Sequence, residues 1–129
     1  MAIDLDKLQQ LLNHKFSDPD LARLALTHRS ANKLNNERLE FLGDSLLGYI
    51  VAEILFEFFP QASEGELSRL RAMLVNKTTL AEIAREIDLK NFIQLGSGEK
   101  KSGGDNRDSI LADAVEALIA AIYLDGGIN

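Results

Sequence analysis

Residues 35–45 read NNERLEFLGDS and begin a mostly apolar stretch that continues to Phe59. Within it Glu37, Glu40 and Asp44 are spaced at i, i+3 and i+7, so in a helix of 3.6 residues per turn they share one side. The residues between and after them are so apolar that the stretch predicts a helix over 36–59 that is buried nearly all round. Pro60 follows and ends it. An acidic stripe on such an apolar helix is the first feature that points to a functional site.

The rest of the chain also has the three- and four-residue apolar spacing of helices, and no convincing strand pattern competes with it. Residues 96–107, GSGEKKSGGDNR, are rich in Gly and charge and predict a mobile loop. We therefore expect an all-α fold, one helical domain of about six to seven helices. The further helices are predicted from Asp4 or Asp6 to Asn13, from Asp18-Pro19 to about His28, over 63–75 with Leu67, Leu70, Met73 and Leu74 inward, from Asn76 or Thr78 to Ile87, as a short turn over 90–94, and over 108–124 with Gly126-Gly127 as the stop.

The composition is that of an ordinary globular domain. The chain has 129 residues with no Cys and no Trp, and its N-terminus, MAIDLDKLQQ, lacks the basic start and apolar run of a signal peptide. A reducing, cytoplasmic setting is predicted. The formal net charge of -6 opposes nucleic-acid binding, so bound cations or a basic partner domain would have to supply the attraction.

A second pair of carboxylates lies in the last predicted helix. Asp113 and Glu116 stand at i, i+3 within the apolar run ILADAVEALIAAIYL. Acidic pairs on two facing helices are a recurring way to build metal sites, and all-oxygen ligation favours Mg²⁺ or Mn²⁺. Arg38 could offset part of the charge. Spacing alone leaves a second interpretation open, in which these residues are solvated faces of amphipathic helices.

Two glycines interrupt the first apolar helix. Gly43 and Gly48 each cost about 1 kcal/mol relative to Ala in a helix interior. Close packing would compensate, and Gly43, beside Phe41 and Asp44, would let another helix approach the acidic stripe. That helix can belong to the same subunit or to a partner, and the sequence does not decide between the two.

The run NNERLEFLGDS resembles the signature motif of the ribonuclease III family. The resemblance extends to His28-Arg29-Ser30, to EGELSRLR from Glu64, to residues 98–104 and to ILADAVEAL from Ile110, and so covers essentially the whole chain. Bacterial members of the family continue into a double-stranded-RNA-binding domain. We expect residues 1–129 to be the catalytic domain without that domain, in an excised form.

The resemblance implies roles for particular residues. Glu40, Asp44, Asp113 and Glu116 match the family's metal ligands, with Asp44 and Glu116 as the catalytic pair. Glu37 and Glu64 match accessory residues of its acidic valley. Phe41 matches an aromatic residue that inserts into the partner of a homodimer, which favours the interface interpretation of Gly43.

The chemistry that the resemblance implies is the Mg²⁺-dependent hydrolysis of double-stranded RNA, with Mn²⁺ as a substitute. A metal-activated water attacks the phosphorus and leaves 5′-phosphate and 3′-hydroxyl ends with a short 3′ overhang. This would serve the processing of ribosomal and messenger RNA. The alternative is a non-catalytic relative, a dimerisation or RNA-binding module, although such modules usually lose metal ligands and all four are kept here.

Basic residues and histidines allow weaker inferences. The two histidines, His14 and His28, are predicted to be structural. The candidate phosphate contacts, which can equally be solvated, are Arg69, Arg71, Lys100, Lys101 and Arg107.

Overall fold

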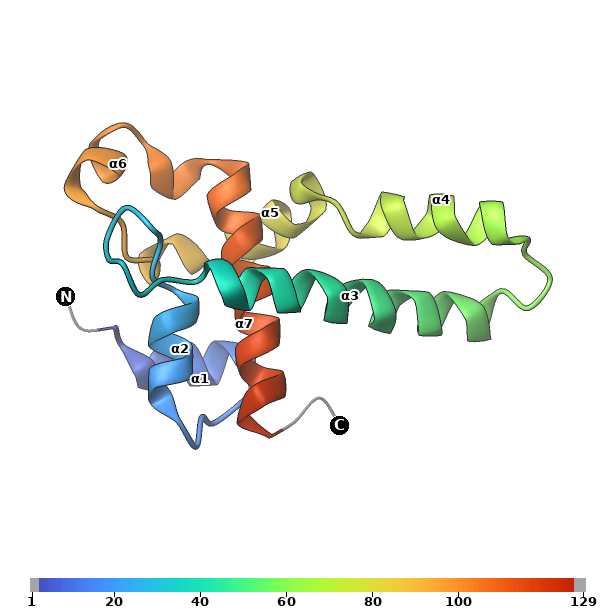
Figure 1. The fold of residues 1–129 in the computed structure, drawn as a ribbon, viewed down its shortest axis with the longest axis horizontal. Helices are drawn as coiled ribbons and strands as arrows, with labels where there is room; N and C mark the ends of the chain where they lie inside the picture. Colours follow the sequence, from blue (N-terminus) through green and yellow to red (C-terminus); the bar gives the residue numbers. More distant parts are fainter. Residues whose placement is uncertain (1–2, 127–129) are drawn as a thin grey trace.

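The structure is a computed structural model and describes residues 3–126. Within that range the chain forms seven α-helices and two short 3₁₀ helices, and its only β pairing is an isolated bridge between Thr27 and Gln94. The predicted all-α class is confirmed (Figure 1). The elements are α1 (Leu5–Leu12), α2 (Pro19–Ala25), α3 (Glu37–Phe58), α4 (Glu64–Leu74), α5 (Lys77–Glu86), η1 (Leu89–Asn91), α6 (Ser97–Lys101), η2 (Gly104–Asn106) and α7 (Asp108–Asp125).

Helix α7 is the centre of the fold. It packs against α3, α5 and α2, and it crosses the first part of α3 in the body of the molecule (Figure 1). Small side chains allow neighbouring helices to come close on several of its sides, while Leu111 and Leu118 fill the core. The buried alanines of α7 are Ala112, Ala114, Ala117, Ala120 and Ala121.

The second half of α3 leaves the body and forms an antiparallel hairpin with α4 (Figure 1). Phe56 and Phe58 are 71% and 73% exposed, and Met73 on α4 is 70% exposed. Within a single chain, the prediction that this helix is buried nearly all round is therefore wrong. The prediction that Met73 and Leu74 point inward is wrong as well. The reason is that only the first half of α3 has α7 behind it. Exposed apolar area of this extent marks a protein contact surface.

The helix starts follow the local signals, whereas α2 ends at Ala25, before the predicted end near His28. Ser63 and Glu66 form the predicted capping box at the start of α4, and Asp18 caps α2 ahead of Pro19. Residues 96–107 are ordered into α6 and η2, so the prediction of a mobile loop there is wrong. Tertiary packing accounts for the order, because Gly104 is buried against Glu99. Gly126 ends α7, and Gly127 lies outside the described residues.

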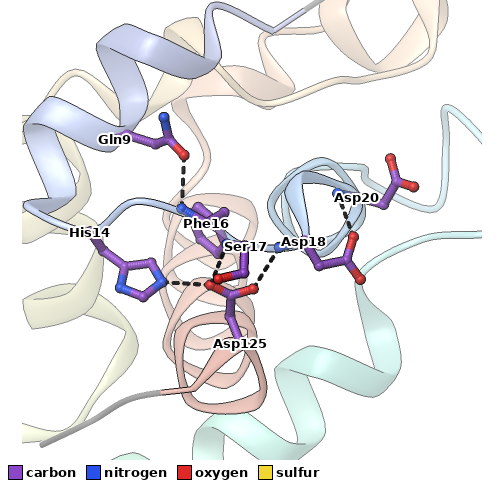
Figure 2. Close-up of polar contacts among 7 residues, drawn as sticks. All are labelled: Gln9, His14, Phe16, Ser17, Asp18, Asp20 and Asp125. Carbon is purple, nitrogen blue, oxygen red and sulfur yellow. Dashed lines mark hydrogen bonds and ion pairs between the residues drawn. The ribbon is translucent and has the colours of Figure 1, made fainter.

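A buried carboxylate fastens the start of the chain to the end of α7. Asp125 accepts hydrogen bonds from the backbone N–H groups of Ser17 and Asp18, at 2.9 and 2.8 Å, and lies 3.0 Å from Nε2 of His14 (Figure 2). The predicted structural role of His14 agrees with this contact. The hydrogen bonds from Asp18 and Ser17, and then that with His14, lower the pKa of Asp125. The network holds the α1–α2 connection against α7.

Replacement of Asp125 by Ala is expected to lower the melting temperature at neutral pH. Because the pKa of Asp125 is depressed in the folded chain, its stabilising effect is complete above the ordinary pKa of about 3.9 and is lost as the pH falls through the folded-state value. Thermal unfolding followed from about pH 7 to about pH 3 should show the two proteins converging at the acid end. Asp6→Ala, an exposed position on α1, is the control, and an Asp125→Ala variant as stable as the wild type at pH 7 would contradict the assignment.

No helix within residues 3–126 has the combination of length and apolar character that a membrane span requires.

Candidate metal centre

The crossing of α3 and α7 depends on Gly43. This residue is buried, and a Cβ atom placed on it would lie 1.7 Å from the backbone oxygen of Glu116. Only glycine lets the two backbones approach this closely. Of the two interpretations of Gly43, the structure supports close packing within one chain, and the interface assignment of this residue needs correction. A Cβ atom on Gly48, in contrast, would meet nothing within 4 Å among the described residues.

The same crossing gathers the predicted carboxylates. One oxygen each from Glu40, Asp113 and Glu116 lies within 4.8 Å of the other two. Asp44, one turn further along α3, is exposed and lies outside this group, and its interaction with Glu116 raises the pKa of Glu116. Three carboxylates from two helices therefore meet at one point and Asp44 adjoins them beside Glu116, and we call these four residues the carboxylate cluster.

Burial and mutual repulsion shape the protonation of the carboxylate cluster. Burial, then the hydrogen bond and charge of Asp44, then the charges of Asp113 and Glu40 raise the pKa of Glu116 to about 8. The pKa of Glu40 is also raised, first by burial and then by Asp113. At neutral pH the cluster therefore retains a proton when no cation is bound.

One lysine offsets part of this charge. Nζ of Lys77, the first residue of α5, lies 3.6 Å from Oδ1 of Asp113 and lowers the pKa of Glu40. Within residues 3–126, the contact of Lys77 with Asp113 is the only ion pair to a residue of the carboxylate cluster. Arg38, which the sequence suggested for that role, is exposed on α3. No local pattern marks Lys77, because its contact depends on how α5 packs against α7.

A polar hollow of about 280 Å³ adjoins the cluster, and Glu40 and Asp113 form part of its wall. Glu37 also lines it and lies 3.8 Å from Arg29. Across the hollow, Arg107 lies 3.7 Å from Glu99. Of the accessory acidic residues, Glu37 thus belongs to this site within one chain.

The other predicted site residues lie elsewhere. Glu64 begins α4 at the tip of the hairpin, about 20 Å from Asp44 at 1.5 Å per residue along α3 (Figure 1). Arg69 and Arg71 are exposed on α4, and Lys100 and Lys101 are exposed on α6. Only Arg107 among the predicted phosphate contacts lines the hollow.

The donor set of the cluster fits a hard divalent cation. Carboxylate oxygens are ligands for Mg²⁺ and Mn²⁺, whereas zinc and copper sites favour imidazole or thiolate. A cation would also relieve the repulsion that raises the pKa of Glu116.

The raised pKa of Glu116 makes the stability of the chain depend on pH in a way that can be tested. In EDTA the folded chain binds more protons than the unfolded chain between about pH 4.3, the ordinary pKa of Glu, and about pH 8, so the free energy of unfolding falls across this window. Glu116→Gln should remove this decline, so at the alkaline end its free energy of unfolding should exceed that of the wild type by about 1–2 kcal/mol. This value takes into account that water screens the charge of a partly exposed group. Urea unfolding at several pH values measures it, and parallel curves for the two proteins would refute the assigned titration.

Comparison with known proteins gives the family of the chain. Residues 18–129 match the Ribonuclease-III-like family. Ribonuclease 3 of Azotobacter vinelandii is 60% identical over 129 residues, which is 100% of this chain and 56% of that protein, and ribonuclease 3 of Histophilus somni is 58% identical over 127 residues. The chain therefore spans a little over half the length of these relatives.

Solved structures agree with this result. The nuclease domain of ribonuclease III from Campylobacter jejuni, described for structural flexibility in the region involved in dimer formation, is 48% identical. It superimposes with a TM-score of 0.94 over 96% of this chain and 87% of that one. Dicer from Pichia stipitis, at 31% identity, superimposes with a TM-score of 0.67 over 89% of this chain and 49% of that one. The chain belongs to the ribonuclease III family, and its fold is that of the family's nuclease domain.

Proposed function

We propose that this chain is the catalytic domain of a metal-dependent endoribonuclease that cleaves double-stranded RNA. The observation that carries the proposal is the meeting of Glu40, Asp113 and Glu116 where α3 crosses α7, with Asp44 beside Glu116. Membership of the ribonuclease III family supplies the substrate class. Processing of ribosomal and messenger RNA in the cytoplasm is part of the proposal.

In this proposal the four carboxylates hold Mg²⁺, for which Mn²⁺ can substitute. A cation bound there supplies an activated water and neutralises the charge that develops on the phosphate. Glu116 and Asp44, which interact across the crossing, form the catalytic pair. Burial of Glu116 fixes its position on α7, so the ligands are arranged before substrate arrives. The expected products have 5′-phosphate and 3′-hydroxyl ends and a short 3′ overhang.

The active form is proposed to be a homodimer that buries the apolar surface left open on α3. Phe41 is 75% exposed and lies beside an apolar hollow of about 1080 Å³ that includes Leu21, Leu34 and Leu124. An aromatic side chain of this kind can fill the corresponding hollow of a second copy, an exchange that twofold symmetry repeats on both sides. Glu64, far from the cluster of its own chain, can join an acidic valley only across such a dimer.

Phe41→Ala should weaken the dimer by about 30-fold or more, because a central aromatic anchor at an interface contributes about 2 kcal/mol or more. Sedimentation equilibrium at micromolar concentration measures the change. Leu11→Ala, which removes an exposed leucine of α1, should have no effect. A wild-type protein that stays monomeric would refute the shared valley.

The function is tested by incubating the protein at low salt with duplex RNA, the single strands of that RNA, and duplex DNA of the same sequence. Mg²⁺ should permit cleavage of the RNA duplex only, and EDTA should stop it. The second candidate, a non-catalytic binding module, predicts RNA binding without cleavage in both Mg²⁺ and Mn²⁺. The complete carboxylate cluster favours the enzyme.

A further inference from the structure

His28 is held in one tautomer by its neighbours. The backbone N–H of Ser30 donates to Nδ1 of His28 at 3.1 Å, and Oγ of Ser30 lies 2.7 Å from the same nitrogen. A backbone N–H can only donate, so Nδ1 must accept, and the ring proton of the neutral imidazole is on Nε2. The backbone N–H of Gly96 donates to Oγ of Ser30 at 2.9 Å, which leaves the hydroxyl hydrogen free to point at Nδ1.

The backbone around His28 is also fixed. The N–H of His28 donates to the carbonyl of Gln94 at 3.0 Å. A Cβ atom on Gly96 would lie 2.2 Å from the carbonyl oxygen of Ser30, so this approach too requires glycine. Two segments far apart in the sequence are thus joined, and the imidazole is preorganised.

The imidazole lines the polar hollow beside the carboxylate cluster. Its Nε2–H has no hydrogen-bond acceptor among residues 3–126. Lys77 lines the same hollow with its side chain 65% exposed, and its 3.6 Å separation from Asp113 is that of a loose ion pair. Exposed ion pairs of this kind contribute little, so Lys77 can turn to another anion at small cost.

The chemistry of the wall selects the ligand. Apart from Ile110, the described side chains that line the hollow are polar or charged, so it offers no aromatic or broad apolar face on which a base could stack. Arg29 and Arg107 form pairs as loose as that of Lys77, at 3.8 Å from Glu37 and 3.7 Å from Glu99, but these two carboxylates lie outside the carboxylate cluster and would keep their charge when a cation binds there. A cation on the cluster would neutralise Glu40 and Asp113, and the donors left over are His28 and Lys77. A phosphate group accepts from both kinds of donor.

We propose that this hollow is a phosphate-binding subsite, in which Nε2–H of His28 and Nζ of Lys77 donate to a backbone phosphate of the RNA next to the one that is cut. The inference rests on the proposed function and extends it. It gives His28 a role beyond the structural one that the sequence predicted, and it makes Ser30 a positioning residue that acts through the imidazole.

The test is duplex-RNA binding by fluorescence anisotropy with Ca²⁺, together with cleavage kinetics in Mg²⁺. His28→Ala and Lys77→Met should each weaken binding about tenfold, as expected for one hydrogen bond to a charged group. His28→Gln, whose amide nitrogen can stand near the position of Nε2, should recover most of the loss. Lys77→Met should also reduce the slope of log K against log salt by about 0.9, whereas the neutral His28 should leave the slope unchanged.

Lys90→Met, an exposed lysine of η1 outside the hollow, is the matched control and should behave as wild type. Thermal unfolding identifies any variant that fails to fold, and the Gln and Met variants keep the test open if His28→Ala does. The subsite is refuted if RNA binding equals that of the wild type in all three variants, which are His28→Gln, Lys77→Met and a folded His28→Ala. Cleavage by the wild type bears separately on the proposed function, because the binding measurement does not require it.

Discussion

Replacement of Glu116 by Gln is expected to reduce cleavage of duplex RNA in Mg²⁺ by about 10³-fold or more. Glu116 is the buried member of the carboxylate cluster, and the amide removes a negative ligand oxygen at almost constant shape. Metal ions stabilise such transition states by several kcal/mol, and each 1.36 kcal/mol is a factor of ten in rate. Single-turnover kinetics with excess protein measure the loss.

The matched control is Glu82→Gln, an exposed carboxylate on α5, which should cut at the wild-type rate. The Glu116→Gln protein should remain folded, and in EDTA it should be more stable than the wild type at about pH 8, as the raised pKa of Glu116 requires. A Glu116→Gln variant within tenfold of the wild-type rate would show that Glu116 has no direct part in the reaction.

The second large effect is expected at Gly43. In Gly43→Ala the new methyl group would meet the backbone oxygen of Glu116, and neither helix backbone can move without disturbing the core. We expect a loss of about 3 kcal/mol or more in the free energy of unfolding, at the upper end for overpacked cores. Cleavage should fall as well, because separating α3 from α7 moves Glu40 and Asp44 away from Asp113 and Glu116. Urea denaturation measures the first effect.

Gly48→Ala is the internal control for this substitution. It lies on the same helix, but its added methyl group would meet no atom of residues 3–126 within 4 Å, so the better helix propensity of Ala should stabilise the chain by about 1 kcal/mol. Similar effects of the two substitutions would mean that helix propensity, and not the crossing with α7, determines the response at Gly43.

The sequence predicted the parts of the fold that depend on local chemistry. Spacing at i, i+4 placed Glu40 with Asp44, and spacing at i, i+3 placed Asp113 with Glu116. The capping box at Ser63 marked the start of α4 correctly. Periodicity could not show that α3 crosses α7 at Gly43, nor decide whether that glycine serves the chain or its partner. Such a contact depends on which surfaces meet in three dimensions.

The wrong predictions have the same origin. Residues 96–107 were expected to be mobile because their composition is rich in Gly and charge, yet Gly96 and Gly104 are sites of close packing that order the segment. Phe56 and Phe58 were expected to be buried because they are apolar, yet the part of the chain that the structure describes leaves both exposed. Lys77 gave no local signal, since its place beside the carboxylate cluster depends on contacts distant in sequence.

The most direct measurement of the central claim is anomalous scattering from crystals soaked in Mn²⁺. The account predicts a strong peak bounded by carboxylate oxygens of Glu40, Asp44, Asp113 and Glu116, and its absence from crystals of the Glu116→Gln variant. A cleaving wild-type protein whose crystals show no Mn²⁺ peak at this crossing, or show it only elsewhere, would contradict the assignment of the carboxylate cluster as the metal centre.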